Sequence, residues 1–133
     1  MKNKYEISTK DKIEISYRAF ILSSLLNLGF SPTTKGTYYL RDLILLALQT
    51  NFKDRDIAIK SLTNQLAEQI KIPPNRVKAN LDYAFKYRND QKAHDHFKDL
   101  FGITYDPYFL TAKSIISLML NLIYMKELDK KKR

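Results

Sequence analysis

Residues 60–88 decide the fold, and they read KSLTNQLAEQIKIPPNRVKANLDYAFKYR. Apolar residues on both sides of the Pro-Pro pair recur every three or four positions, which is the period of an amphipathic helix. Pro74 suits the first position of a helix, because the N–H group that proline lacks has no partner there. We therefore predict one helix over 60–70 and a second from Pro74 to about Arg88. The side chains expected to be buried are Leu62, Leu66, Ala67 and Ile70 in the first helix and Val77, Leu81, Ala84 and Phe85 in the second.

The same helical spacing continues on both sides of this pair. Gly29 and Gly102 are typical residues at the end of a helix, and Thr37 and Thr111 are typical caps at the start of one. The segment from Tyr38 to about Gln49 is apolar nearly all round, apart from Arg41-Asp42 at one edge, so we expect it to lie at the centre of the core. Including these segments, the further helices that we expect cover 13–28, 38–49, 54–59, 91–101 and 112–128.

Composition agrees with an all-α fold. The chain has 133 residues but only three glycines and four prolines, whereas the two together make up about 12% of an average protein. No strand pair, internal repeat or domain boundary is evident. We therefore expect a single domain over 1–133, a compact bundle of six or seven helices that contains a helix-turn-helix. Residues 1–11 and 129–133 are expected to be frayed basic ends.

The chain contains no cysteine. A disulfide framework, a thiol nucleophile and a Cys-based zinc site are therefore excluded, and an intracellular location fits best. Neither a signal peptide nor an apolar run long enough to cross a membrane is present. We expect a cytoplasmic protein without a membrane partner.

Charge points to a nucleic-acid partner. The formal net charge is +9 and the pI is about 9.6, values typical of nucleic-acid-binding domains. Residues 71–88 alone carry five Lys and Arg against one Asp, a net +4.

Catalytic motifs are hard to find. The two histidines, His94 and His96, would point about 200° apart on a helix, so they do not form a metal pair. Lys35-Gly36 is far from a phosphate-binding loop, and the carboxylates lie singly or beside Lys and Arg. We expect no enzymatic activity, no small-molecule substrate, no metal and no cofactor.

A helix-turn-helix over 60–88 would use its second helix to read duplex DNA, with that helix in the major groove. The side chains expected to face the bases are Asn75, Lys78, Asp82 and Tyr83, and those expected to contact phosphates are Lys71, Arg76, Lys86, Arg88 and Lys35. Two simpler interpretations remain open. The pair can be a helical hairpin whose polar face is only solvated, and Lys78 and Asp82, four residues apart, can neutralise each other.

Several segments together resemble the effector domain of the sporulation master regulator, stage-zero sporulation protein A. The resemblance covers about residues 20–128 and rests on Leu28-Gly29-Phe30, the run from Lys35-Gly36 to Leu43-Ile44, Leu66-Ala67-Glu68, Asn75-Arg76-Val77 and Leu100-Phe101-Gly102. It implies an all-helical bacterial transcription regulator that binds double-stranded DNA. It also implies self-association on tandem copies of a short box, and contact with RNA polymerase.

Two departures from that family bear on function. The match begins about 20 residues after Met1, so we expect a stand-alone domain without a receiver domain or a phosphorylation switch. Ala79 and Asp82 occupy positions where the family carries arginines, Tyr83 replaces a histidine and Lys78 replaces an acidic residue, whereas Arg76 matches. The family's box specificity is therefore not carried over. The alternative is a protein-interaction module or antagonist that keeps the fold without the DNA specificity.

Overall fold

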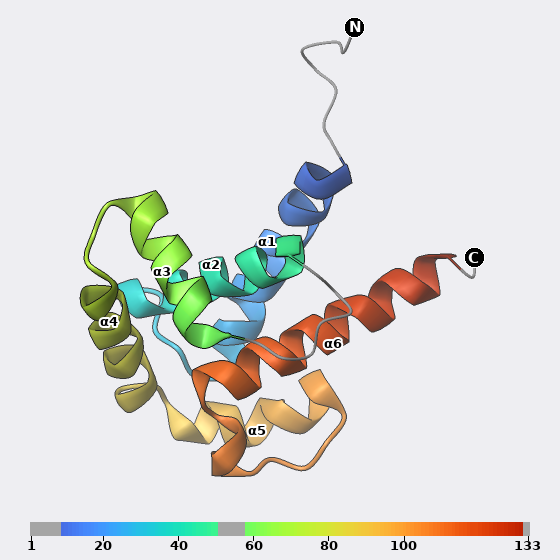
Figure 1. Ribbon diagram of the computed structural model, residues 1–133. Coiled ribbons are helices and arrows are strands. Elements are labelled where there is room, and N and C mark those ends of the chain that lie inside the picture. The colour runs from blue at the N-terminus through green and yellow to red at the C-terminus, as the bar shows by residue number, and fades with distance from the viewer. Residues whose placement is uncertain (1–8, 51–57, 132–133) are drawn as a thin grey trace, which may run out of the picture.

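The computed structural model describes residues 9–50 and 58–131. Over these residues the chain is helical without any strand, which confirms the all-α prediction (Figure 1). The elements are α1 (Thr9–Asn27), α2 (Lys35–Thr50), α3 (Ile59–Ile70), α4 (Pro74–Lys86), α5 (Asp90–Phe101), the 3₁₀ helix η1 (Pro107–Phe109) and α6 (Ala112–Lys131). None of these helices is long and apolar enough to span a bilayer.

Helix α2 is the centre of the core, as its apolar sequence predicts. It packs against α1, α3, α4 and α6. Its side chains are buried almost all round, whereas Arg41 and Asp42 are half-buried and pair with each other at 3.0 Å. A helix buried on every side orients its neighbours, so the position of α4 is set largely by α2.

The start of α2 differs from the prediction. The helix begins at Lys35, and Thr37 is not its cap but a fully buried residue of the first turn. The backbone N–H of Thr37 donates to the carbonyl of Thr34. The helix extends through Gly36 because this residue has no side chain and its backbone can pack directly on α4. A Cβ at Gly36 would lie 2.0 Å from the carbonyl oxygen of Asn80.

Other helix boundaries, and the burial of Phe85, also differ from the sequence prediction. Helix α4 ends at Lys86, two residues before Arg88, and Phe85 is only half-buried. Residues 9–11 and 129–131, which the sequence analysis placed in the end segments, belong to α1 and α6. In α6 the last-turn Lys130 pairs with Glu127, a contact that favours the helix terminus. Of the short helix expected over 54–59, residues 54–57 lie outside the described residues and Ile59 begins α3.

Gly29 and Gly102 follow the ends of helices, and Thr111 caps the start of α6, as the sequence predicts. Gly29 follows α1 with a φ of +95°, and its backbone carbonyl accepts a 2.8 Å hydrogen bond from the N–H of Asn89. Helix α5 ends at Phe101, and Gly102 follows it with a left-handed φ of +75°. The hydroxyl of Thr111 accepts from the N–H of Ser114 at the start of α6. The turn η1 before it is not evident from the sequence pattern.

Candidate nucleic-acid interface

Helices α3 and α4 are joined by a tight three-residue turn over 71–73. Lys71 adopts a left-handed φ of 59° and ends α3, while the N–H of Ile72 donates back to the carbonyl of Ala67. Pro74 then begins α4, as predicted. The turn exposes Lys71 directly beside the N-terminus of α4.

One face of helix α4 is buried against the core and holds the helix in place. Val77, Leu81 and Ala84 are buried, and α4 packs against α2 and α3. The close approach of Gly36 to Asn80 adds a backbone contact to this interface. The opposite face of α4 is therefore held in a defined orientation although it makes few contacts of its own.

That opposite face carries the four side chains predicted to face DNA bases. Asn75, Lys78, Asp82 and Tyr83 are all exposed. The structure divides them into two groups. Asn75, Lys78 and Asp82 line a groove toward α3 and α6, whereas Tyr83 lies outside this groove with its ring centroid 4.5 Å from that of Tyr87. Lys78 and Asp82 form no direct ion pair with each other in the described part of the chain.

The five residues predicted to contact phosphates differ in their surroundings. Lys71, Arg76 and Lys35 are exposed, and none of the three forms an ion pair with another described residue. Lys35 is the first residue of α2, next to the Gly36 contact with α4. Lys86 is also exposed, and its ammonium lies 5.5 Å from the ring centroid of Tyr87.

Arg88 is held differently from the other four. Its side chain is 16% exposed and donates to the carbonyl of Phe85 at 3.2 Å and to the carboxylate of Asp90 at 3.1 Å. These contacts connect the end of α4 to the start of α5. The primary role of Arg88 in this geometry is therefore to fix the turn between the two helices.

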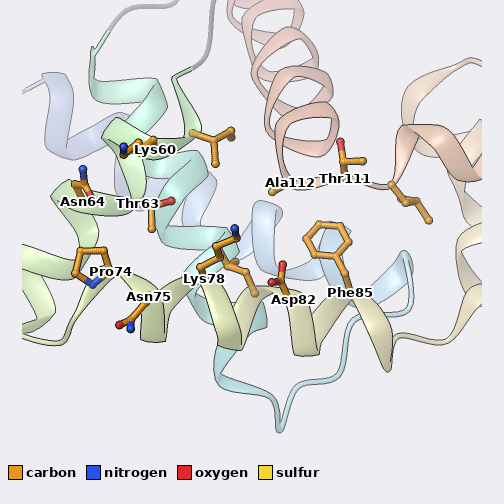
Figure 2. Close-up of a pocket in the computed structure, with 13 residues that line it drawn as sticks. Lys60, Thr63, Asn64, Pro74, Asn75, Lys78, Asp82, Phe85, Thr111 and Ala112 are labelled. Atoms are coloured by element: carbon orange, nitrogen blue, oxygen red, sulfur yellow. The ribbon is translucent and has the colours of Figure 1, made fainter.

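A groove lies beside α4 on this face (Figure 2). It has a volume of about 730 Å³ and is bordered by α3, α4 and the start of α6. Its lining combines apolar side chains such as Leu81 and Phe85 with the polar side chains of Lys78 and Asp82.

Lys60 and Asn64 of α3 line the same groove and were not among the predicted site residues. Both are exposed and stand four positions apart, off the buried stripe of their helix. That spacing shows only that they share a face. Their position beside Asn75 and Lys78 follows from the packing of α3 on α4, which the sequence pattern does not specify.

The histidines lie outside this site. His94 and His96 are both exposed on α5, and the His94 ring centroid lies 5.6 Å from that of Tyr105. Burial and a hydrogen bond to Asp90 raise the pKa of Tyr105. Within residues 9–50 and 58–131 no three His, Cys, Asp or Glu side chains are grouped so as to hold a metal ion.

A second polar cluster connects α1 to α6. The buried Tyr17 donates its hydroxyl proton to the Glu127 carboxylate, and the Lys130 ammonium lies 3.3 Å from that carboxylate. The hydrogen bond from Tyr17 lowers the pKa of Glu127, and burial raises the pKa of Tyr17. This cluster stabilises the packing of two helices far from α4.

Comparison of the chain with protein-family models, with curated proteins and with solved structures gave no match.

Proposed function

We propose that this chain is a transcription regulator that binds double-stranded DNA through the exposed face of α4. The observation that carries the proposal is the set of exposed cations around the first half of that helix. Lys71, Arg76 and Lys78 are exposed and lack ion pairs with other described residues. Such cations are available to neutralise phosphates, which supply most of the affinity for DNA.

Within this proposal the side chains have different roles. Lys71, Arg76, Lys86 and Lys35 contact the phosphate backbone, and Arg88 positions the end of α4. Lys78 donates to guanine and Asn75 bonds to adenine, the pairings that the major groove favours. Asp82 accepts from the amino group of cytosine, the one base for which a carboxylate is suited. Tyr83, at the edge of this face, contacts the sugar-phosphate backbone or a base.

The resemblance to the sporulation-regulator effector domain supports the same proposal. The matching segments include the start of α4 and the Lys35-Gly36 segment that packs against it. Self-association on tandem sites and contact with RNA polymerase are further proposals that rest on this resemblance. Ala79 and Asp82 depart from the family's arginines, so we propose a different target sequence.

The proposal is tested by fluorescence anisotropy with a labelled random-sequence duplex at two salt concentrations. We expect the parent to bind more tightly at low salt, with log affinity falling by about 0.9 per phosphate contact for each unit of log salt. Lys71→Ala combined with Arg76→Ala should weaken binding to every duplex and flatten that slope by about two units. Lys92→Ala, an exposed cation on α5, is the control and should bind like the parent. Salt-independent binding, or no binding at low salt, contradicts the proposal.

The groove favours a second candidate function, the binding of a partner protein. Its volume of about 730 Å³ and its apolar lining are not needed for contact with a DNA backbone. An antagonist that keeps the fold and docks a protein segment would use such a groove.

A further inference from the structure

We infer that the groove between α3, α4 and the start of α6 docks a short amphipathic segment of a partner protein that carries carboxylates beside its apolar face. The inference deepens the second candidate function, and the docking itself does not depend on DNA binding.

The first support is the apolar lining of the groove. The buried side chains of Leu81 and Leu110 line it together with the half-buried Phe85. The Phe85 ring projects from α4 toward the start of α6 (Figure 2). Ile59 and Ala112 extend the apolar lining at the starts of α3 and α6. The volume of about 730 Å³ lies within the range of about 300–1,000 Å³ that is typical of ligand sites. Apolar side chains spaced one helical turn apart on a partner helix fit grooves of this kind.

The second support is the charge of the rim. Lys60 on α3 and Lys78 on α4 both line the groove, and neither has an ion-pair partner among the described residues. Asp82 is the single carboxylate among the described side chains that line the groove. Two ammonium groups against one carboxylate attract a partner with negative charge. Rim charges of this sort mainly determine specificity and association rate, whereas the apolar lining supplies affinity.

The groove also overlaps the proposed DNA-reading face. Asn75, Lys78 and Asp82 belong to both surfaces. A segment seated in the groove covers these side chains, so the segment and DNA exclude each other. This consequence rests on the proposed function, and it makes an acidic partner an antagonist of DNA binding.

The docking is tested without DNA, with two labelled synthetic peptides of about 15 residues, long enough to form a helix. Both carry Leu at i, i+4 and i+7. One carries Glu on the flanking positions and the other carries Lys. We expect fluorescence anisotropy to show that the Glu peptide binds the parent at least about ten-fold more tightly than the Lys peptide, a difference of about 1.4 kcal/mol.

Variants of exposed residues locate the site. Lys60→Glu combined with Lys78→Glu should weaken binding of the Glu peptide by about ten-fold or more. The charge-matched control, Lys92→Glu with Lys98→Glu on α5, should bind like the parent, because neither residue lines the groove. Asp82→Asn should strengthen binding. Circular dichroism melts of each variant establish that the fold is kept.

The outcomes separate the two hypotheses. Absence of Glu-peptide binding, equal binding of both peptides, or equal binding by the parent and the Lys60/Lys78 variant overturns the docking inference. Amide shifts in NMR spectra that fall on α5 instead of the groove also overturn it. Peptide binding without duplex binding supports the docking inference and contradicts the DNA proposal. Duplex binding without peptide binding supports the DNA proposal and overturns the docking inference.

Discussion

The backbone of Gly36 lies directly against the carbonyl oxygen of Asn80, so closely that a Cβ at position 36 would be 2.0 Å from that oxygen and 2.8 Å from the Cβ of Ala84. This contact joins the first turn of α2 to the middle of α4. It fixes how far the proposed DNA-reading helix stands from the central helix of the core. It also places Lys35 next to α4.

Gly36→Ala should therefore destabilise the protein. The added methyl group overlaps backbone atoms that cannot rotate away, and overpacking of this kind costs about 1–3 kcal/mol. Urea denaturation measures the free energy of unfolding. Gly102→Ala is the control, because a Cβ there meets nothing within 4 Å and only its left-handed φ of 75° opposes the change, at about 1–2 kcal/mol. A larger loss at Gly102 than at Gly36 would contradict this account of α4 packing.

Arg88→Ala should affect stability more than DNA affinity. The substitution removes hydrogen bonds to the Phe85 carbonyl and to Asp90, which hold the turn between α4 and α5. Hydrogen bonds made by a charged group contribute about 1.5–3 kcal/mol. Lys86→Ala is the matched variant and should lower the melting temperature less than Arg88→Ala does, while it flattens the salt dependence of DNA binding by about one unit. A flattened slope with unchanged stability in Arg88→Ala would instead assign Arg88 to the phosphate backbone.

Lys78→Ala should reduce sequence discrimination. If Lys78 donates to guanine, its loss costs about 1–3 kcal/mol on the preferred site and little on random DNA. The preferred site comes first from selection on a random duplex library, and anisotropy then compares both DNAs. Equal losses on the two DNAs would place Lys78 on the phosphate backbone.

Asp82→Arg should raise the affinity for all duplexes, because it replaces an exposed carboxylate on the proposed interface by a cation. It also restores the residue type of the resembled family, so preference should shift toward that family's box. Asp95→Arg, at an exposed position on α5, is the control for added charge. Equal gains in the two variants would mean that position 82 lies outside the interface.

The Tyr17–Glu127 contact should make stability depend on pH. The hydrogen bond from Tyr17 lowers the pKa of Glu127 in the folded state, so the unfolded state binds more protons as the pH falls. The resulting stabilisation is complete above the ordinary Glu pKa of about 4.3 and disappears as the pH falls through the lower folded value. Urea denaturation at about pH 7 and about pH 3 should show Glu127→Gln less stable than the parent at the higher pH only.

Tyr17→Phe provides the control for this contact, since it keeps the buried ring and removes only the hydroxyl. When Glu127→Gln is made in the Tyr17→Phe protein, it should change the pH dependence of the free energy of unfolding much less than it does in the parent. An undiminished difference would assign the pH dependence to another carboxylate.

The sequence by itself determined where most helices lie. Pro74 begins α4, Gly29 and Gly102 follow helices, and Thr111 caps α6, as predicted. These signals act over a few residues, because a proline ring, a left-handed φ or a capping hydroxyl affects only its own turn of helix. The buried centre at α2 was predictable for a similar reason, since a helix that is apolar on every side has no polar face to expose.

Only the tertiary structure decided what lies beside α4. Thr37 is a buried residue of α2 because Gly36 lets α2 pack directly on α4. Arg88 is held in place because its guanidinium donates to the Phe85 carbonyl and to the Asp90 carboxylate. Lys60 joins Lys78 at one groove although the two are 18 positions apart. Helical periodicity gives the face of each residue but not the neighbour of that face. The neighbour depends on how separate helices pack around the core.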